Sequence, residues 1–282
     1  MKLETELPTG TFKARGAAYA LGRRVASGTV REVVAASTGN HGAAVAWAAR
    51  AQGIAATIFV PRGSNPVKLA RIGALGGEIR EIGAILAESI DNAAEYAAVR
   101  DAYFLHDAID PDVPVGAATI AAELVEQVPS MGRIYIPVGD TALIRGVAAE
   151  AKRQRPGVQI VGVQTQNAPA YYRSWQSGVV VTTDSANTIA DGLATTRPVA
   201  ENVACIRELV DEMVLVSEQD LSDAIGWLLF HEHVVAEPAG AASVAAFRKH
   251  KPDESNAVLL ITGCNISPEL LKRAALCFGA HE

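Results

Sequence analysis

Lys13 lies in a segment whose residue types predict amine chemistry. Residues 8–16 read PTGTFKARG, in which proline and glycine predict a turn and Lys13 falls at the start of a predicted helix. The N-terminus of a helix carries partial positive charge, so a lysine cation is mildly unfavourable there. A lysine whose charge is disfavoured is a candidate nucleophile or base. The alternative, an ordinary exposed lysine, is the commoner case.

Two further turns could bind an anion. Residues 37–41 read STGNH and separate an apolar run from a predicted helix, whose first N–H groups lack partners within the helix. Ordinary N-capping needs one such residue, and five consecutive polar or glycine positions exceed that need. Residues 137–146 read PVGDTALIRG and could cradle a phosphate, although Asp140 could also be a simple N-cap. Residues 262–265 (TGCN) predict only a turn when taken alone.

Short β-branched runs alternate with alanine-rich amphipathic runs, and these elements must position the turns. The predicted strands are 33–36, 57–60, 78–82, 134–138, 160–164, 213–216 and 258–261. The predicted helices are 13–27, 41–51, 66–74, 88–100, 116–127, 142–155, 221–231 and 239–249. Short apolar strands that alternate with helices predict an α/β fold of mostly parallel sheets with helices on both faces.

The same pattern predicts two lobes. Residues 32–108 contain enough strand–helix units for a small sheet of their own, and a segment rich in aspartate and proline (107–114) then leads to a new helix. We expect a large lobe of residues 1–31 and 109–282, with a smaller lobe of residues 32–108 inserted into it. Ligands in such folds bind at the carboxyl ends of the strands.

In their order along the chain, these turns resemble the fold type II pyridoxal-phosphate enzymes, the tryptophan-synthase-β superfamily. The resemblance is strongest to the branch of threonine/serine dehydratases (ammonia-lyases) and serine racemases. The motif PTGSFKxRGA of that family is similar to PTGTFKARGA at residues 8–17, and its SxGNH motif is similar to residues 37–41. Residues 188–193, 237–241 and 262–265 look like its TIADG, EPxGA and SGGN segments. The resemblance spans nearly the whole chain and implies two lobes, each an open and mostly parallel sheet flanked by helices.

The resemblance also implies how the cofactor, pyridoxal 5'-phosphate, is bound. Lys13 would form a Schiff base with its aldehyde and later remove the Cα proton of the substrate. The cofactor phosphate would be bound by the backbone amides of Gly139, Asp140, Thr141, Ala142 and Leu143. The remaining cofactor-binding residues would be Phe12, Asn40, Gly192, Glu237 and Thr262, with Asn40 at the ring hydroxyl and Thr262 at the pyridine nitrogen.

The substrate and the reaction follow from the same resemblance. The substrate carboxylate would be bound by the loop of Ser37, Thr38, Gly39, Asn40 and His41. The neutral hydroxyl of Thr262 cannot keep the pyridine nitrogen protonated, which favours β-elimination over transamination. The implied enzyme is an ammonia-lyase that converts a β-hydroxy amino acid such as L-threonine or L-serine into a 2-oxo acid and ammonia.

Three positions depart from the family pattern. The phosphate loop is usually a run of glycines, and a carboxylate at Asp140 would repel a phosphate, so we expect this side chain to turn outward. Gln164 stands where many relatives carry a carboxylate that binds a divalent metal; a hard cation prefers carboxylate oxygens, so we predict no metal site. Thr38 stands where the racemase branch has an acid/base serine, which favours elimination over racemisation.

The beginning of the chain leaves alternatives open. The chain starts inside what resembles the first strand of the family, and we expect Met1–Glu6 to form an edge strand with an unpaired side. Free strand edges promote association, so we predict a homodimer. An amino-acid racemase, a dehydratase of a specialised hydroxy amino acid and a truncated, non-catalytic relative remain as alternatives to the ammonia-lyase.

Composition narrows the class of protein and its partners. The chain has 282 residues, of which 49% are hydrophobic, and this excludes a disordered chain, a disulfide miniprotein and a collagen-like fibre. A net charge of −6 without a basic cluster argues against nucleic acid or an anionic membrane as the main partner. The resemblance implies a small amino acid as the partner instead. Three cysteines, no transmembrane run and no signal peptide predict a cytoplasmic protein.

Overall fold

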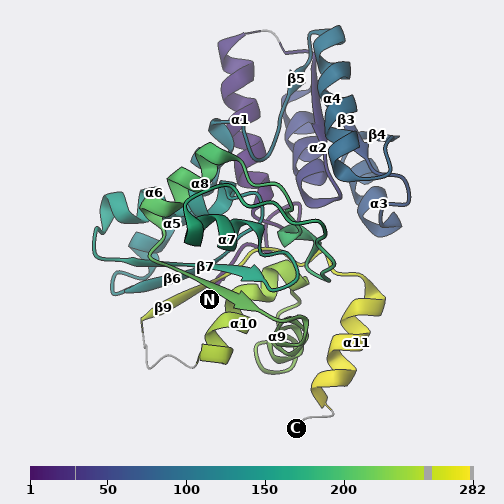
Figure 1. The fold of residues 1–282 in the computed structure, drawn as a ribbon. Coiled ribbons are helices and arrows are strands. Elements are labelled where there is room, and N and C mark those ends of the chain that lie inside the picture. The colour runs from purple at the N-terminus through teal and green to yellow at the C-terminus, as the bar shows by residue number, and fades with distance from the viewer. Residues whose placement is uncertain (29, 251–255, 280–282) are drawn as a thin grey trace. The chain divides into compact units, whose positions relative to one another are not determined.

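A computed structural model describes residues 1–28, 30–250 and 256–279 (Figure 1). The chain divides into two compact units: residues 7–116, called the small-sheet unit below, and Met1–Glu6 with Ala117–Glu282, called the large-sheet unit. In the part of the chain that is described, each unit contains one sheet, and all paired strands in both sheets are parallel.

The small-sheet unit is built on the strand order β4-β3-β2-β5. Its strands are β2 (Glu32–Ala36), β3 (Ala55–Val60), β4 (Glu78–Glu81) and β5 (Tyr103–Phe104), and its helices are α1 (Lys13–Ser27), α2 (Asn40–Gln52), α3 (Pro66–Ala74) and α4 (Leu86–Arg100). Successive strand side chains point to opposite faces. Phe59 accordingly packs against Ala93 and Ala97 of α4, whereas its neighbour Ile58 lies against Gly42 of α2.

The large-sheet unit has the strand order β1-β9-β6-β7-β8, with β1 at the edge. Its strands are β1 (Lys2–Leu3), β6 (Arg133–Pro137), β7 (Gln159–Thr165), β8 (Glu212–Val216) and β9 (Ala257–Ile261). Its helices are α6 (Ala142–Gln154), α7 (Ala170–Ser177), α8 (Ala200–Leu209), α9 (Glu218–His231), α10 (Pro238–His250) and α11 (Pro268–Gly279), with the 3₁₀ turn η1 (Asp191–Leu193). Helix α5 (Asp112–Gln127) crosses the division between the units.

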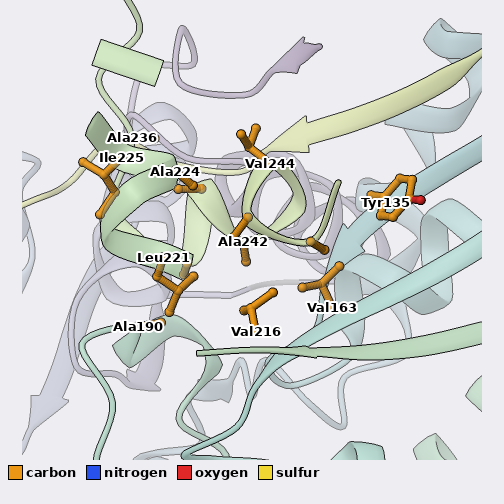
Figure 2. Close-up of a cluster of buried hydrophobic side chains, with 14 of the residues drawn as sticks. Tyr135, Val163, Ala190, Val216, Leu221, Ala224, Ile225, Ala236, Ala242 and Val244 are labelled. Carbon is orange, nitrogen blue, oxygen red and sulfur yellow. The ribbon is translucent and has the colours of Figure 1, made fainter. Parts of the chain in front are cut away.

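Strand β7 shows how the large sheet is covered on both faces. Val161 and Val163 belong to a buried cluster that also contains Leu221 of α9 and Ala242 of α10 (Figure 2). The residue between them, Gly162, points the other way, and a Cβ built there would lie 3.1 Å from Ile144 Cδ1 of α6. Strands buried on both faces are apolar without alternation, which explains why short continuous apolar runs identified them.

Local capping explains where several helices begin and end. Ser217 and Asp220 form a reciprocal capping box at the start of α9. Asn65 caps α3 by accepting the Val67 N–H at 2.9 Å, and a proline occupies the first turn. Gly53 ends α2 with φ 69°, a left-handed conformation that glycine adopts at little cost.

The predicted α/β class with parallel, helix-flanked sheets is confirmed. Each predicted strand and helix overlaps an observed one, and β1 is the expected edge strand. The sequence analysis missed β5, α7, α8 and α11. The assignment of residues 32–108 to an inserted lobe stays a prediction. None of the described helices is long and apolar enough to cross a membrane.

Candidate active site

Lys13 lies at the start of α1 and is not an ordinary exposed lysine. Its side chain is 16% exposed, and its Nζ forms an ion pair with the carboxylate of Asp107, whose side chain is 10% exposed. Asp107 follows the carboxyl end of β5, where Leu105 continues the pairing with β2 through a hydrogen bond from its N–H to the Val34 carbonyl oxygen. A candidate base and a carboxylate therefore meet at the carboxyl edge of the small sheet.

His41 is the third member of this group. It is buried in the first turn of α2, and its Nε2 donates to the Leu105 carbonyl oxygen at 3.0 Å. Its Nδ1 lies 3.8 Å from Asp107 Oδ1. We call Lys13, His41 and Asp107 the lysine cluster. All three lie in the small-sheet unit, so their positions relative to one another do not depend on the other unit.

A neighbouring histidine is held in its neutral form. Burial lowers the pKa of His106 below its ordinary value, and the nearby His41 acts in the same direction, whereas the Asp107 carboxylate opposes both. The neutral ring of His106 accepts a hydrogen bond from the Ala108 N–H at its Nδ1, 3.1 Å away. His106 therefore fixes the turn that carries Asp107.

The predicted carboxylate loop, residues 37–41, joins β2 to α2 as expected. Ser37 Oγ is buried and accepts the Gly39 N–H at 3.0 Å, and Gly39 is the N-cap residue of α2, so no side-chain cap is made there. A Cβ at Gly39 would overlap the side chain of Lys68. An N-terminus without a side-chain cap at the end of a parallel strand is suited to bind an anion.

The predicted phosphate loop, residues 139–143, joins β6 to α6. Its most unusual residue is Thr141, a β-branched residue with φ 72° at the N-cap of α6, where it makes no side-chain capping bond. Left-handed conformation in such a residue is a strained exception and is concentrated at functional sites. The Asp140 carboxylate accepts the Thr195 hydroxyl at 3.4 Å.

Four glycines lie where four segments of the large-sheet unit come close together, and we call them the glycine cluster: Gly139, Gly192, Gly240 and Gly263. A Cβ at Gly139 would overlap the Gly192 carbonyl oxygen, and one at Gly240 would overlap the Gly263 carbonyl oxygen. These backbones can approach so closely only because glycine has no side chain.

Glu237 and Thr262 lie beside the glycine cluster. Glu237 is buried, and its N–H donates to the Gly263 carbonyl oxygen at 3.0 Å. Thr262, also buried, directly precedes Gly263. The large-sheet unit thus brings together predicted cofactor residues from four distant segments, and the small-sheet unit does the same for Phe12, Lys13 and residues 37–41.

Two residues that position the site were missed by the sequence analysis. Asp107 was assigned to a connecting segment; recognising the short apolar strand before it would have placed it beside the end of β2. Glu218 accepts hydrogen bonds from the Thr165 and Thr188 hydroxyls and from the Ile189 N–H, and so anchors the segment that leads to Gly192. Nothing in the local sequence distinguishes Glu218 from an ordinary acidic residue at a helix start.

Comparison with known proteins places the chain in a family. A family model described as "Pyridoxal-phosphate dependent enzyme" matches residues 1–263. The chain belongs to this family. The L-threonine ammonia-lyase of Thermotoga maritima is 36% identical over 97% of this chain and 68% of its own length. The corresponding enzyme of Geobacter sulfurreducens is 34% identical over 94% of the chain and 66% of its own length, so the chain spans about two thirds of these relatives.

Solved structures show the same fold. Maize serine racemase superposes with a TM-score of 0.90 at 29% identity, over 99% of this chain and 86% of the racemase. The processed threonine deaminase isoform 2 of Solanum lycopersicum superposes with a TM-score of 0.92 at 29% identity, over 99% of this chain and 78% of that one. The predicted resemblance to the fold type II enzymes is therefore confirmed.

The residues of this pyridoxal-phosphate dependent enzyme fit the cofactor. The partly buried amine of Lys13 can bind an aldehyde, and the N-terminus of α6 offers backbone N–H groups to a phosphate without competition from a Thr141 side-chain cap. The roles of the individual cofactor- and substrate-binding residues stay predictions.

The prediction that no metal is bound also stays a prediction. Within the described ranges, no three His, Cys, Asp or Glu side chains group as a metal site would require. Gln164 is completely buried, and its Oε1 accepts the Tyr172 N–H at 2.9 Å. The single oxygen of its side chain is thus neutral and already accepts a hydrogen bond.

Proposed function

We propose that this chain is an ammonia-lyase that converts a β-hydroxy amino acid such as L-threonine or L-serine into a 2-oxo acid and ammonia: water is lost in the β-elimination and is taken up again when the released enamine hydrolyses. One observation carries the proposal: relatives that match 94–97% of the chain at 32–36% identity are named L-threonine ammonia-lyase or dehydratase. The catabolic L-threonine dehydratase of Escherichia coli K12 is matched over 82% of its own length, which supports an activity contained within this span.

The division of labour among the residues is part of the proposal. Bound pyridoxal phosphate supplies an electron sink that stabilises negative charge at the substrate Cα. Lys13 Nζ binds the cofactor and, as a free amine, takes the Cα proton. The N–H groups at the start of α2, with Ser37, Thr38 and Asn40, orient the substrate carboxylate. Holding the substrate in one orientation lowers the entropic part of the barrier.

The large-sheet residues bind the rest of the cofactor in this proposal. Backbone amides of residues 139–143 bind the phosphate, while Gly192 and Glu237 border the cofactor. The buried Thr262 hydroxyl meets the pyridine nitrogen as a neutral partner. A neutral partner would not keep this nitrogen protonated as a carboxylate does. Less of the negative charge at the substrate Cα would then be delocalised into the ring, which favours rapid loss of a β-leaving group.

Racemisation is the second candidate, because serine racemase from maize superposes over 99% of the chain. In the proposed alignment Thr38 stands where that branch uses a serine, so we expect elimination to dominate. Purified protein loaded with pyridoxal phosphate should form 2-oxobutanoate and ammonia from L-threonine, or pyruvate from L-serine. Chiral analysis of the remaining amino acid measures racemisation in the same reaction.

Lys13→Ala tests the enzyme class. Without this amine, the protein should incorporate no pyridoxyl group after borohydride reduction and should lose turnover, since Lys13 is the lysine that the motif at residues 8–17 assigns to the cofactor. Peptide mass spectrometry locates the label, and Lys2→Ala is the matched control because Lys2 bonds Glu123 and Gln127 instead. Label and turnover retained in Lys13→Ala would refute the assignment. A wild-type chain that captures cofactor but turns over no amino acid would favour the non-catalytic alternative.

We also propose that the protein acts as a homodimer in the cytoplasm. Strand β1 leaves one edge of its sheet available, and Phe230 and Leu276 are 51% and 66% exposed. Edges and exposed apolar side chains promote association. The three cysteines are free thiols, which suits a reducing compartment. Light scattering measures the mass in solution, and a monomer at micromolar concentration would refute the dimer.

A further inference from the structure

We propose that Asp107 is a positioning residue for Lys13: it holds Nζ in the ammonium form, so that proton loss from this ion pair controls capture of the cofactor. The proposal rests on the proposed function, in which Lys13 is the lysine that binds pyridoxal phosphate. It adds a residue to the site that neither the motifs nor the predicted cofactor contacts include.

The geometry of the lysine cluster carries the inference. The Lys13 ammonium pairs with Asp107 Oδ2, and both side chains are largely buried, at 16% and 10% exposed. Ion pairs on the surface are weakened by water and salt, whereas a pair that is mostly removed from water keeps its strength. The lysine predicted to react is thus held by one specific carboxylate.

His41 borders the carboxylate on its other side. A carbonyl oxygen can only accept, so the Leu105 contact places the proton of a neutral His41 on Nε2. Nδ1 then faces Asp107 Oδ1 at 3.8 Å. With that tautomer Nδ1 donates no proton to the carboxylate, whereas the Lys13 ammonium pairs with it directly.

Other titratable groups of this region lie on the turn that carries Asp107 and on α3. His106 and Asp110 lie on the same turn, and the pKa of His106 is lowered by burial, so this ring contributes little positive charge at neutral pH. Lys68 of α3 packs over Gly39, beside the first turn of α2. The Lys13 ammonium is in direct contact with the Asp107 carboxylate.

The consequence concerns two proton transfers. An aldehyde is attacked by a neutral amine, so Lys13 must first lose the proton that Asp107 stabilises. The same carboxylate stabilises the proton once Nζ has taken it from the substrate Cα. Asp107 therefore slows capture of the cofactor at low pH and strengthens Lys13 as a base during turnover.

Asp107→Asn is the direct test, with Asp107→Glu as the conservative variant that keeps the charge. The matched control is Asp110→Asn, because Asp110 lies on the same turn but bonds the Tyr103 hydroxyl and the Asp112 N–H. Each protein is freed of cofactor, mixed with pyridoxal phosphate between pH 6 and pH 10, and reduced with borohydride. Mass spectrometry then measures the label on Lys13.

The midpoint of capture in Asp107→Asn should lie about 1–3 pH units below that of the wild type, which is the effect of one nearby opposite charge. Asp107→Glu and Asp110→Asn should stay near the wild-type midpoint. Identical midpoints for the wild type and Asp107→Asn would overturn the inference and leave the proposed function standing. A wild-type chain without label on Lys13 at any pH would overturn both.

A second measurement covers the case in which Asp107→Asn does not fold. Wild-type protein free of cofactor and labelled at the lysine side chains is titrated by NMR, with Lys13→Ala used to assign the signal. Lys13 should retain its proton to higher pH than the exposed lysines. Loss of the proton at lower pH than those lysines would overturn the inference.

Discussion

Gly139→Ala tests whether the glycine cluster is a cradle for the cofactor phosphate. Gly139 does not have a left-handed φ, so alanine brings no backbone strain of its own, and the substitution adds a single methyl group. That methyl would lie well inside the 3.0 Å that real Cβ atoms keep from other heavy atoms, and its neighbour is the backbone oxygen of Gly192. Since a backbone atom cannot rotate away, the 139–143 loop or the η1 turn must move.

Two magnitudes follow from this clash. Forcing one extra methyl group into a packed region costs about 1–3 kcal/mol of unfolding free energy. For a protein of this size, that corresponds to a melting temperature lower by about 2–12 °C. Displacing the loop also removes one charge-assisted hydrogen bond from the phosphate, worth about 1.5–3 kcal/mol, which weakens cofactor affinity about 10- to 100-fold.

The assay separates the two effects. The melting temperature of the cofactor-free protein measures the cost of the clash. Fluorescence titration with pyridoxal phosphate measures the cofactor affinity, and so the contribution of the loop to phosphate binding. Gly157→Ala is the matched control, because Gly157 lies in the same unit, lacks a left-handed φ and has open space where a Cβ would be. If Gly139→Ala and Gly157→Ala have the same melting temperature, the packing argument is wrong. A lower melting temperature with unchanged affinity would refute the phosphate role alone.

Two other predictions follow from titration and ion binding. The pKa of His106 is lowered by burial, so below its ordinary value of 6.5 the unfolded chain binds a proton that the folded chain does not. The wild type should therefore lose stability as the pH falls from about 6.5 to 5, and His106→Gln should lose less over the same range. Urea unfolding at each pH measures the free energy of unfolding, and an equal decrease in both proteins would contradict this. Magnesium or calcium should not raise the melting temperature beyond sodium chloride at equal ionic strength, because Gln164 offers only one neutral oxygen. A calcium-specific rise would show that a site exists.

The fold could be predicted where the pattern of apolar residues and the turn residues that flank it indicate the same element. Apolar runs such as 134–138 and 160–164 are buried on both faces of a sheet, and β-branched residues with flanking turns identify them without further information. Residues 170–177 read AYYRSWQS, a short run without valine, leucine or isoleucine, yet they form α7. This helix depends on tertiary packing, through the buried Tyr171 and Ser174, and local propensity does not contain that information.

The site could be predicted only in part for a similar reason. Motifs identify residues that must be of one type, such as Lys13 or the glycines at 139 and 192. They do not identify Asp107, because its importance comes from the pairing of β5 beside β2, which brings position 107 next to a lysine 94 residues away. Strand order in a parallel sheet is set by tertiary structure, so a residue that acts through such a neighbour is visible only in the fold.

Thr141 supports a binding role for its loop without reference to any relative. Holding a β-branched residue at φ 72° costs about 1–3 kcal/mol, a substantial part of the stability of a folded domain. Packing alone does not require this residue, since glycine would adopt the same conformation without strain. The conformation is retained at the N-terminus of α6, where Arg145 Nε donates to the Thr141 hydroxyl at 3.2 Å and leaves the first amides of the helix uncapped by that side chain. Strain at the position where an anion would be bound is what a loop shaped for a ligand, rather than for stability, is expected to show.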